Sequence, residues 1–362
     1  MTSNVTMQIT TEIPLAPTGY SSPTQLDDAQ STLQSRAPEP VEEPEPRRSV
    51  RVPDLFSSIM ASRPTVNPNY FKVKAEGDGW IAKIMSFDKT SAKNIRVDFC
   101  FLSSIWVPNA DEEALRMTLD WNHWIFHFDD QFDEGHLKDN PIAAREEIDR
   151  TMAIMEKGTT LYTPEQNPIR YVFQTCWQQL VKRASPVAQV ERSTRGDALK
   201  VDIDTYIDIR RGNIGVYPAI AVAEYGHGIR LPESIFQHPA LQECMRVSSD
   251  LVFMTNDVVS YRKDLESGVH YNLITILSEQ GMSIQQSVDK IGTLIDTCYQ
   301  RWYTALATLP PYGEEIDGQV LMFVDICRFI ALGNLHWSFK TGRYHGPEGY
   351  DIYRTRIMHL PS

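Results

Sequence analysis

From about residue 54 onward, apolar side chains recur at the spacing of three and four residues that an amphipathic helix requires, and alternating strand patterns are rare. Caps and breakers divide this pattern into separate segments. Asn109-Ala-Asp-Glu112 has the spacing of a capping box, and Gly268 follows a long periodic stretch. We expect helices over 109–135, 140–157, 239–267, 283–309 and 314–341. Since no repeat or second shift in composition interrupts the pattern, the sequence predicts one large all-α domain.

Residues 1–50 differ from the rest of the chain. They are polar, rich in Ser, Thr, Pro and Glu, and reach low complexity between Pro38 and Pro46. Such a stretch cannot bury enough apolar surface to offset the entropy lost on ordering. We therefore expect a disordered tail over 1–50 and a single folded domain over 51–362. The basic run from Arg47 to Arg51 is either a solvated boundary or a strap over an anionic site.

Net charge and cysteine usage exclude several functional classes. The formal net charge of -12 argues against nucleic acid as a partner and suits a site that concentrates divalent cations. The five cysteines are dispersed, without Cys-x-x-Cys spacing, which is typical of a reducing compartment and of proteins without structural zinc. No apolar run is long enough to span a bilayer, and the first residues lack the basic start and apolar stretch expected of a signal peptide. The sequence predicts a cytoplasmic protein, either a monomer or a homodimer.

The first polar cluster is Asp129-Asp130-Gln131-Phe132-Asp133-Glu134, which follows bulky apolar residues between Trp121 and Phe128. Asp129 and Asp133 stand four residues apart, so a helix places their carboxylates one above the other. Like charges at that spacing repel each other unless a cation or basic group lies opposite. The cluster is therefore either a solvated acidic patch near a helix end or part of a site for a hard cation.

A second polar cluster lies within the long helix expected over 239–267. Asn256, Ser260 and Asp264 recur at every fourth residue, which aligns an amide, a hydroxyl and a carboxylate along one side. All three offer oxygen, which magnesium prefers, and magnesium takes few protein ligands when it shares substrate phosphate oxygens and water. The alternative is the ordinary polar face of a partly buried helix.

Two basic segments could face these acids. Arg210 and Arg211 end a periodic stretch, and two glycines three residues apart, in Gly212-Asn213-Ile214-Gly215, then break it. A helix interrupted there exposes backbone groups that could point into a cavity. Arg343-Tyr344 follows the last expected helix, where an arginine ordinarily complements the helix dipole.

In combination, these four motifs resemble the signature set of class I terpene cyclases of microbial type. The resemblance covers about residues 52–345 and consists of Asp-Asp-x-x-Asp, Arg-Arg-x-Asn-x-Gly, Asn-Asp-x-x-Ser-x-x-x-Asp and Arg-Tyr. Residues 52–59 and 129–135 look most like the fungal sesquiterpene cyclases of the presilphiperfolanol and brasilane kind. The family likeness implies a single α-helical bundle around a central apolar pocket.

The resemblance also implies a role for each matching residue. The magnesium ligands would be Asp129, Asp133, Asn256, Ser260 and Asp264, which would hold three ions together with the substrate. The donors to the diphosphate would be Arg210, Lys263, Arg343 and Tyr344. Asn213 matches the position that links Arg210 to Ile214, whose carbonyl would face the nascent cation, although the family often has Asp or Thr where Asn213 stands. The catalytic set would thus be Asp129, Arg210, Asn213 and Ile214.

Three further side chains would form the pocket wall. Phe126 and Trp337 stand where the family places aromatic rings that stabilise a carbocation, and His123 stands where an aromatic residue is common. Ordinary core packing explains Phe126 and Trp337 equally well.

These roles imply a magnesium-dependent lyase that ionises farnesyl diphosphate, cyclises the carbocation to a sesquiterpene hydrocarbon or alcohol, and releases diphosphate. Geranylgeranyl diphosphate is the alternative substrate. From a different class, a non-catalytic isoprenoid-binding bundle would keep the apolar pocket but would have no use for metal ligands on two helices.

Overall fold

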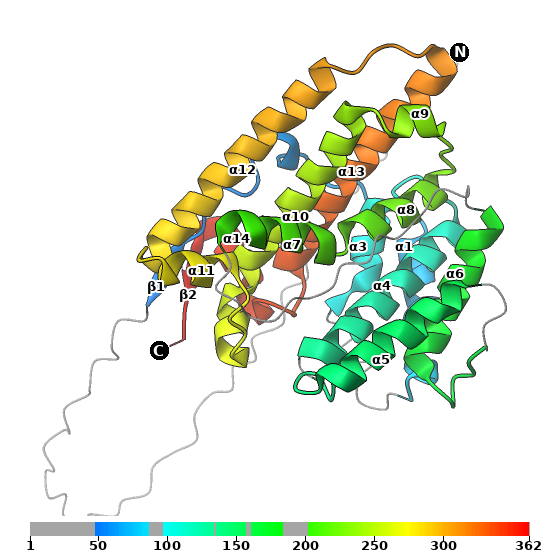
Figure 1. The fold of residues 1–362 in the computed structure, drawn as a ribbon, viewed down its shortest axis with the longest axis horizontal. Helices are drawn as coiled ribbons and strands as arrows, with labels where there is room; N and C mark the ends of the chain where they lie inside the picture. The colour runs from blue at the N-terminus through cyan, green and yellow to red at the C-terminus, as the bar shows by residue number, and fades with distance from the viewer. Residues whose placement is uncertain (1–47, 87–96, 134, 157–160, 184–201, 362) are drawn as a thin grey trace, which may run out of the picture. The chain divides into compact units, whose positions relative to one another are not determined.

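The computed structural model describes residues 48–86, 97–133, 135–156, 161–183 and 202–361 (Figure 1). Nearly all of the tail expected over 1–50 lies outside these residues, as does Glu134. The α-helices of the described part are α1 (Tyr70–Ile84), α3 (Phe99–Trp106), α4 (Glu112–Asp133), α5 (Pro141–Met152), α6 (Pro168–Arg183), α7 (Ile203–Asn213), α8 (Val216–His227), α9 (Glu233–Phe236), α10 (Pro239–Ser267), α11 (Leu273–Glu279), α12 (Ile284–Ala307), α13 (Glu314–Lys340) and α14 (Gly349–Thr355). Single turns of 3-10 helix lie at η1 (Ser58–Met60), η2 (Ala153–Met155) and η3 (Gly346–Glu348). The predicted all-α fold is confirmed.

Local caps explain where the long helices begin and end. Helix α10 begins with Pro239, whose missing N–H costs nothing at the first helical position, and it ends before Gly268, which has a φ of 65°. The bounds of α10 are those expected from the sequence. Helix α12 begins after Ser283, which forms a capping box with Gln286.

The start of α4 was predicted wrongly. Asn109 was expected to cap the helix, but the side chain of Asp111 accepts the hydrogen bond from the Ala114 N–H, at 2.8 Å, and the helix begins at Glu112. The N–H of Ala110 instead closes a turn onto the carbonyl of Val107. Either polar residue could serve as a cap, and the turn after Val107 leaves this role to Asp111.

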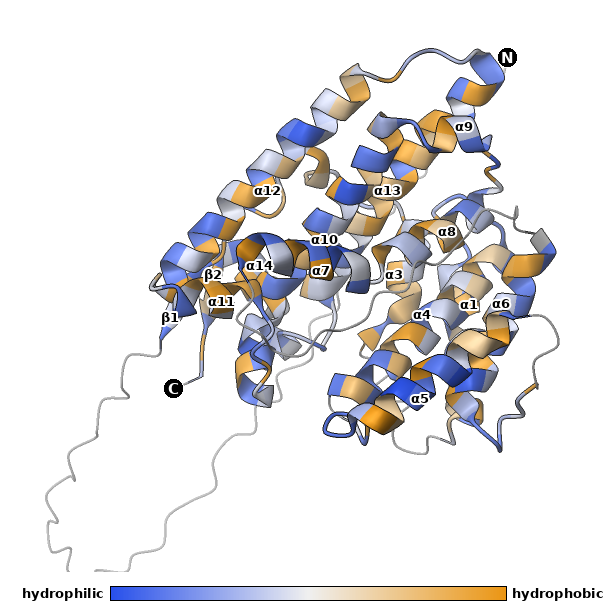
Figure 2. Cartoon of the chain, viewed as in Figure 1, coloured by the Kyte–Doolittle hydropathy of each residue, from blue (hydrophilic) through white to orange (hydrophobic). Residues whose placement is uncertain are grey.

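Helix α10 is the core element of the bundle. Its residues from Leu251 to Thr255 are all buried, so every side of this stretch faces other protein atoms. It packs against α12 and α13, which run beside it in Figure 1. Helix α4 packs against α1, α3, α6 and α8. Figure 2 shows apolar residues (orange) alternating with polar ones (blue) along these helices, as expected when one side of each is buried.

A break separates α7 from α8 at the predicted position. Helix α7 ends at Asn213, and Gly215 has a φ of 81°, a conformation that is costly for residues with a Cβ. Ile214 lies between the two helices, and its N–H still donates to the carbonyl of Arg210 at 2.9 Å. The chain therefore bends at Ile214 and Gly215, after the last helical turn, which carries Arg210 and Arg211.

The described part also contains a small sheet that the sequence did not predict. Strands β1 (Ser49–Arg51) and β2 (Ile357–His359) pair antiparallel, with Val50 opposite Met358 and both side chains buried. The backbone of Arg51 exchanges two hydrogen bonds with the side chain of Gln285 at the start of α12. These contacts anchor the segment that follows α13 and α14.

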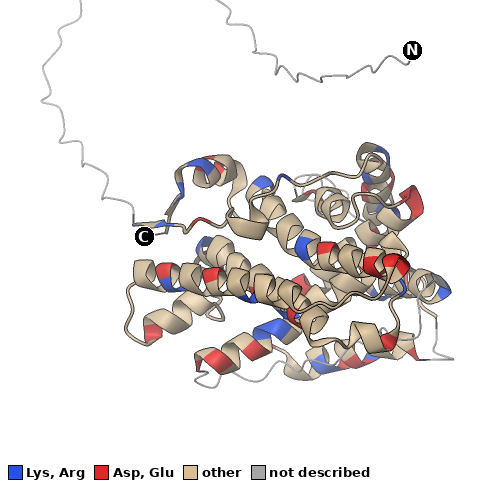
Figure 3. Cartoon of the chain, turned by 90° about the horizontal axis from the view of Figure 1, so that it is seen from above, with Lys and Arg blue, Asp and Glu red and all other residues tan. Residues whose placement is uncertain are grey.

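Among the described residues, no helix combines the length and apolar character needed to cross a bilayer. Charged residues of both signs are interspersed along the helices (Figure 3).

Candidate active site

The last turn of α4 meets the loop that follows α13. Residues Asp129 to Asp133 are half-buried, and Nη2 of Arg343 donates a hydrogen bond to Oδ1 of Asp130 at 2.8 Å. Burial opposes the charge of Arg343, but Tyr344, Asp130 and Asp129 together raise its pKa above the ordinary arginine value. Arg343 therefore stays charged beside the first acidic motif, and it is more than a complement to the dipole of α13.

The next residue in the same loop contacts the second motif. The Tyr344 hydroxyl accepts a hydrogen bond from Nδ2 of Asn256 at 3.1 Å. One dipeptide, Arg343-Tyr344, thus bonds to α4 through Asp130 and to α10 through Asn256. The two predicted polar clusters are brought to one place, which excludes two unrelated solvated patches.

Arg210 approaches the same position from α7. Its Nη2 donates to Oδ1 of Asp257 at 2.9 Å and to Oδ1 of Asn256 at 3.3 Å, and its Nη1 lies 3.5 Å from Oδ1 of Asn213. Burial lowers the pKa of the guanidinium, but Asp257, Tyr206 and Tyr271 together outweigh burial, so the pKa is raised overall. Arg210 is therefore held as a cation next to Asn256.

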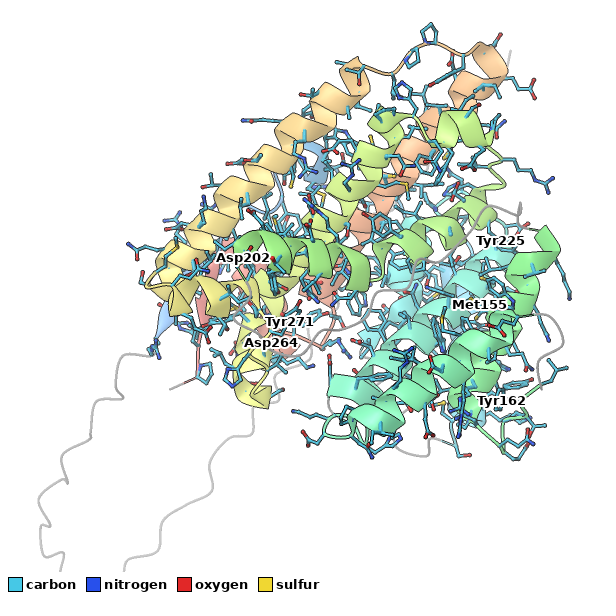
Figure 4. All side chains as sticks on the ribbon, viewed as in Figure 1. Met155, Tyr162, Asp202, Tyr225, Asp264 and Tyr271 are labelled. Carbon is cyan, nitrogen blue, oxygen red and sulfur yellow. The ribbon has the colours of Figure 1, made fainter. Side chains whose placement is uncertain are left out.

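The three polar residues of the second motif lie along α10 as expected. The Ser260 hydroxyl donates to Oδ2 of Asp264 at 2.7 Å, and the same oxygen accepts from Nδ2 of Asn272 at 2.9 Å. Burial raises the pKa of the Asp264 carboxyl in spite of these two donors. The charge of Lys263 lowers the pKa values of both Asp264 and Tyr344, so its ammonium faces the same region. Figure 4 labels Asp264, near the end of α10, and Tyr271, which precedes α11.

The donor chemistry of these residues fits magnesium. Asp129 and Asp133 on α4, with Asn256, Ser260 and Asp264 on α10, offer oxygen ligands. In the described part of the chain, no three side chains of His, Cys, Asp or Glu converge closely enough to hold an ion alone. Burial raises the pKa of the Asp264 carboxyl, and a cation bound there would lower it by stabilising the carboxylate. The arrangement suits ions that also take ligands from a phosphate-bearing substrate.

Aromatic rings gather beside the polar cluster. Phe126 stacks on Phe99 with ring centroids 4.6 Å apart, and it lies 5.0 Å from Trp337. The Arg343 guanidinium lies over the Phe126 ring at 5.2 Å, and Tyr344 meets Trp337 edge-on. Phe126 is partly exposed, whereas Trp337 is fully buried and its Nε1 donates to the carbonyl of Val97. A role of either ring at a substrate stays a prediction, as does the central apolar pocket.

His123 lies deeper in the same cluster. It is fully buried, its ring meets Phe99 edge-on, and its Nε2 lies 3.5 Å from Oδ1 of Asp78 on α1. Burial opposes ionisation of the Asp78 carboxyl, but His123 and Lys74 lower its pKa. His123 therefore joins α4 to α1 at the base of the aromatic cluster.

Two residues of the cluster were given no role from the sequence: Asp257, which stands inside the second motif, and Asn272. Asp257 is 1% exposed, accepts from Arg210 and from the Tyr206 hydroxyl at 2.6 Å, and orients both. Asn272 is fully buried and bonds to Asp264. Asp257 left one signal, a carboxylate that interrupts an apolar stretch of α10. Asn272 left none, because it lies outside both motifs.

Comparisons with known proteins agree on one family. The model of terpene synthase family 2, C-terminal metal binding, matches residues 120–301, which include both acidic motifs. The (+)-eremophilene synthase of Gibberella fujikuroi is 44% identical, over 86% of this chain and 92% of its own. The (1R,4R,5S)-(-)-guaia-6,10(14)-diene synthase of Fusarium mangiferae is 40% identical, over 86% of this chain and 85% of its own.

A comparison of folds is consistent with this family. A solved structure of a cucumene synthase variant matches with a TM-score of 0.67 at 19% identity, over 78% of this chain and 98% of that chain. At this identity, the match speaks for the fold alone. Sequence relatives that span most of the chain, together with this fold, establish that the protein belongs to the terpene synthase family.

Proposed function

We propose that this protein is a sesquiterpene cyclase that acts on farnesyl diphosphate with magnesium. The single observation that carries the proposal is the pair of contacts made by Arg343-Tyr344, to Asp130 on α4 and to Asn256 on α10. They bring two sets of oxygen ligands and several cationic donors around one space, as the binding of a diphosphate requires. The names of the relatives, eremophilene synthase and guaiadiene synthase, support the choice of a hydrocarbon-forming reaction.

The metal ligands would come from both helices. Asp129 and Asp133 would hold magnesium from α4, and Asn256, Ser260 and Asp264 would hold it from α10, with three ions expected in all. Bound magnesium would supply positive charge that stabilises the departing diphosphate. Asp130, which accepts from Arg343, would instead keep that arginine aimed at the diphosphate.

The donors would act when the carbon–oxygen bond breaks. Arg210, Lys263, Arg343 and Tyr344 would donate hydrogen bonds to the diphosphate oxygens, where negative charge grows as the bonding electrons leave with it. Arg210 would exchange part of its bonding to Asn256 for the diphosphate. Because Arg210 also contacts Asn213 and bonds through its carbonyl to the Ile214 N–H, this exchange would move the break between α7 and α8.

The aromatic cluster would protect the cation that remains. Phe126 and Trp337 present ring faces that stabilise positive charge without adding to it as nucleophiles. His123, whose Nε2 lies 3.5 Å from Asp78, would complete the wall and help to exclude water.

The test is to incubate the protein with farnesyl diphosphate, with magnesium and with a chelator, and to assay both diphosphate and volatile products. Magnesium-dependent release of diphosphate together with a cyclic C15 product is expected. Geranylgeranyl diphosphate, assayed in parallel at equal concentration, should react more slowly. Binding of farnesyl diphosphate without turnover would favour a non-catalytic isoprenoid-binding protein and would contradict the proposal.

A further inference from the structure

Both polar atoms of the Asn272 side chain form hydrogen bonds, which connect Asp264 to the backbone of Asp257 and to the start of α11. It is fully buried and lies in the turn that brings the chain back from the end of α10. Its Oδ1 caps α11 by accepting from the Ile274 N–H at 2.9 Å. Its Nδ2 donates to Oδ2 of Asp264 at 2.9 Å and to the backbone carbonyl of Asp257 at 2.8 Å.

The neighbours of Asn272 strengthen the connection to Arg210. The Leu273 N–H donates to Oδ2 of Asp257 at 3.0 Å, the oxygen that also accepts from Tyr206. The other oxygen of Asp257 accepts from Arg210. The ring of Tyr271 packs on the ring of Tyr206 at 4.9 Å. The three-residue segment 271–273 therefore supports Asp264 on one side and the partners of Arg210 on the other.

The geometry at Asp264 shows what Asn272 controls. Ser260 and Asn272 both donate to Oδ2, so together they fix the rotation of the carboxylate and the direction of its other oxygen. The Ser260 hydroxyl donates its proton in this hydrogen bond, so its oxygen lone pairs stay available to bind a cation. Without Asn272, the carboxylate would lose one of its two donors and could turn away from Ser260.

We propose that Asn272 is a positioning residue for the cyclase reaction: it orients Asp264 toward the metal and couples that ligand to the Asp257–Arg210 pair. This inference rests on the proposed function. Outer hydrogen bonds of this kind typically change metal affinity by about 10- to 100-fold when they are removed. The predicted effect is on metal binding, while the fold is kept.

Asn272→Ser is the test variant, because serine remains a good N-cap for α11 but is too short to reach Asp264. Its affinity for Mn²⁺ in the presence of inorganic diphosphate, measured by electron paramagnetic resonance, should fall by about 10-fold or more. The magnesium concentration for half-maximal turnover should rise by a similar factor, with a smaller change in kcat at saturating metal. Asn272→Thr, which also keeps the cap and is equally too short to reach Asp264, takes its place if the serine variant does not fold.

A matched control separates positioning from helix capping. Ser283→Ala removes the cap of α12, where the hydroxyl accepts from the Gln286 N–H, without touching the site. It should lower the melting temperature and leave metal affinity unchanged. A double-mutant cycle adds a second criterion, since Asn272→Ser should have little further effect on Mn²⁺ affinity in an Asp264→Ala background.

The outcomes distinguish the inference from the function on which it rests. If the wild type neither turns over farnesyl diphosphate nor binds Mn²⁺ with diphosphate, the proposed function is wrong. If the wild type does both, and Asn272→Ser keeps normal metal affinity or loses it additively with Asp264→Ala, the positioning role is overturned.

Discussion

Nδ2 of Asn256 donates a hydrogen bond to the Tyr344 hydroxyl at 3.1 Å, across 88 positions of the chain. The Oδ1 atom of the same amide accepts from Arg210. Asn256 is thereby held between two residues that come from α7 and from the loop after α13, and its orientation is set before any substrate arrives. One proposed metal ligand thus lies between two proposed diphosphate donors. Variants can therefore test the ligand and the donors separately.

Tyr344→Phe removes the hydroxyl that bonds to Asn256 and keeps the ring that packs on Trp337. We expect kcat/KM for farnesyl diphosphate to fall by about 10-fold or more, equivalent to about 1.4 kcal/mol of transition-state stabilisation. Thermal unfolding should change little. The control is Tyr350→Phe, since Tyr350 is 71% exposed. Equal kinetics in the two variants would show that the Tyr344 hydroxyl takes no part in the reaction.

Asp129→Ala and Asn256→Ala each remove a proposed metal ligand, one from each helix. Both should abolish turnover of farnesyl diphosphate, because neither helix alone offers enough ligands to hold the ions with the diphosphate. Asp139→Ala, at an exposed aspartate just after α4, should retain activity. Product formation by gas chromatography provides the measurement. Wild-type turnover in either site variant would refute the metal assignment.

Asp257→Asn removes the charge that faces Arg210 and keeps the shape of the side chain. Because Asp257 and Arg210 are both largely buried, the free energy of unfolding should fall by about 3 kcal/mol when the arginine loses its partner. Asp325→Asn breaks an ion pair with Arg328 whose aspartate is 44% exposed, and it should cost less than about 1 kcal/mol. Urea denaturation of both variants decides the matter, and similar losses would contradict the importance of the buried pair.

Glu224→Gln tests a partly buried carboxyl on α8. Burial raises the pKa of Glu224 to about 7, so the folded protein binds a proton there at pH values where the unfolded chain has lost it. Stability from this group is present below about pH 4.5 and is lost as the pH rises toward 7, by an amount on the order of 3 kcal/mol. Glutamine stays neutral, so the variant should gain stability over the wild type between pH 5 and pH 8. A difference that does not grow with pH would show that the carboxyl has an ordinary pKa.

Much of the fold could be predicted because its signals are local. The bounds of α10 and the break after Asn213 depend on Pro239, Gly268 and Gly215, and each of these acts on backbone within a few residues of itself. The start of α4 was missed by the same reasoning, since Asn109 and Asp111 are equally good caps and only the preceding turn selects between them.

The spacing of polar residues on individual helices predicted the residues of the candidate site. It did not predict the hydrogen bonds between residues of different helices. Residues next to each other on a helix point about 100° apart, so Asn256 and Asp257 share Arg210 but otherwise contact different partners. The sequence does not say that Asp257 faces Tyr206 while Asn256 faces Tyr344, because the rotation of α10 is set by the helices packed around it.

What the sequence determined by itself is therefore the helical class of the protein, the bounds of α10, and the types of ligand along α4 and α10. Only the tertiary structure decided that Arg343 reaches Asp130, 213 positions away, and that Asn272 returns to Asp264. The physical reason is the distance along the chain over which each kind of interaction acts. Helix formation and capping follow from hydrogen bonds within about four residues, whereas the meeting of distant side chains follows from the burial of apolar surface between whole helices.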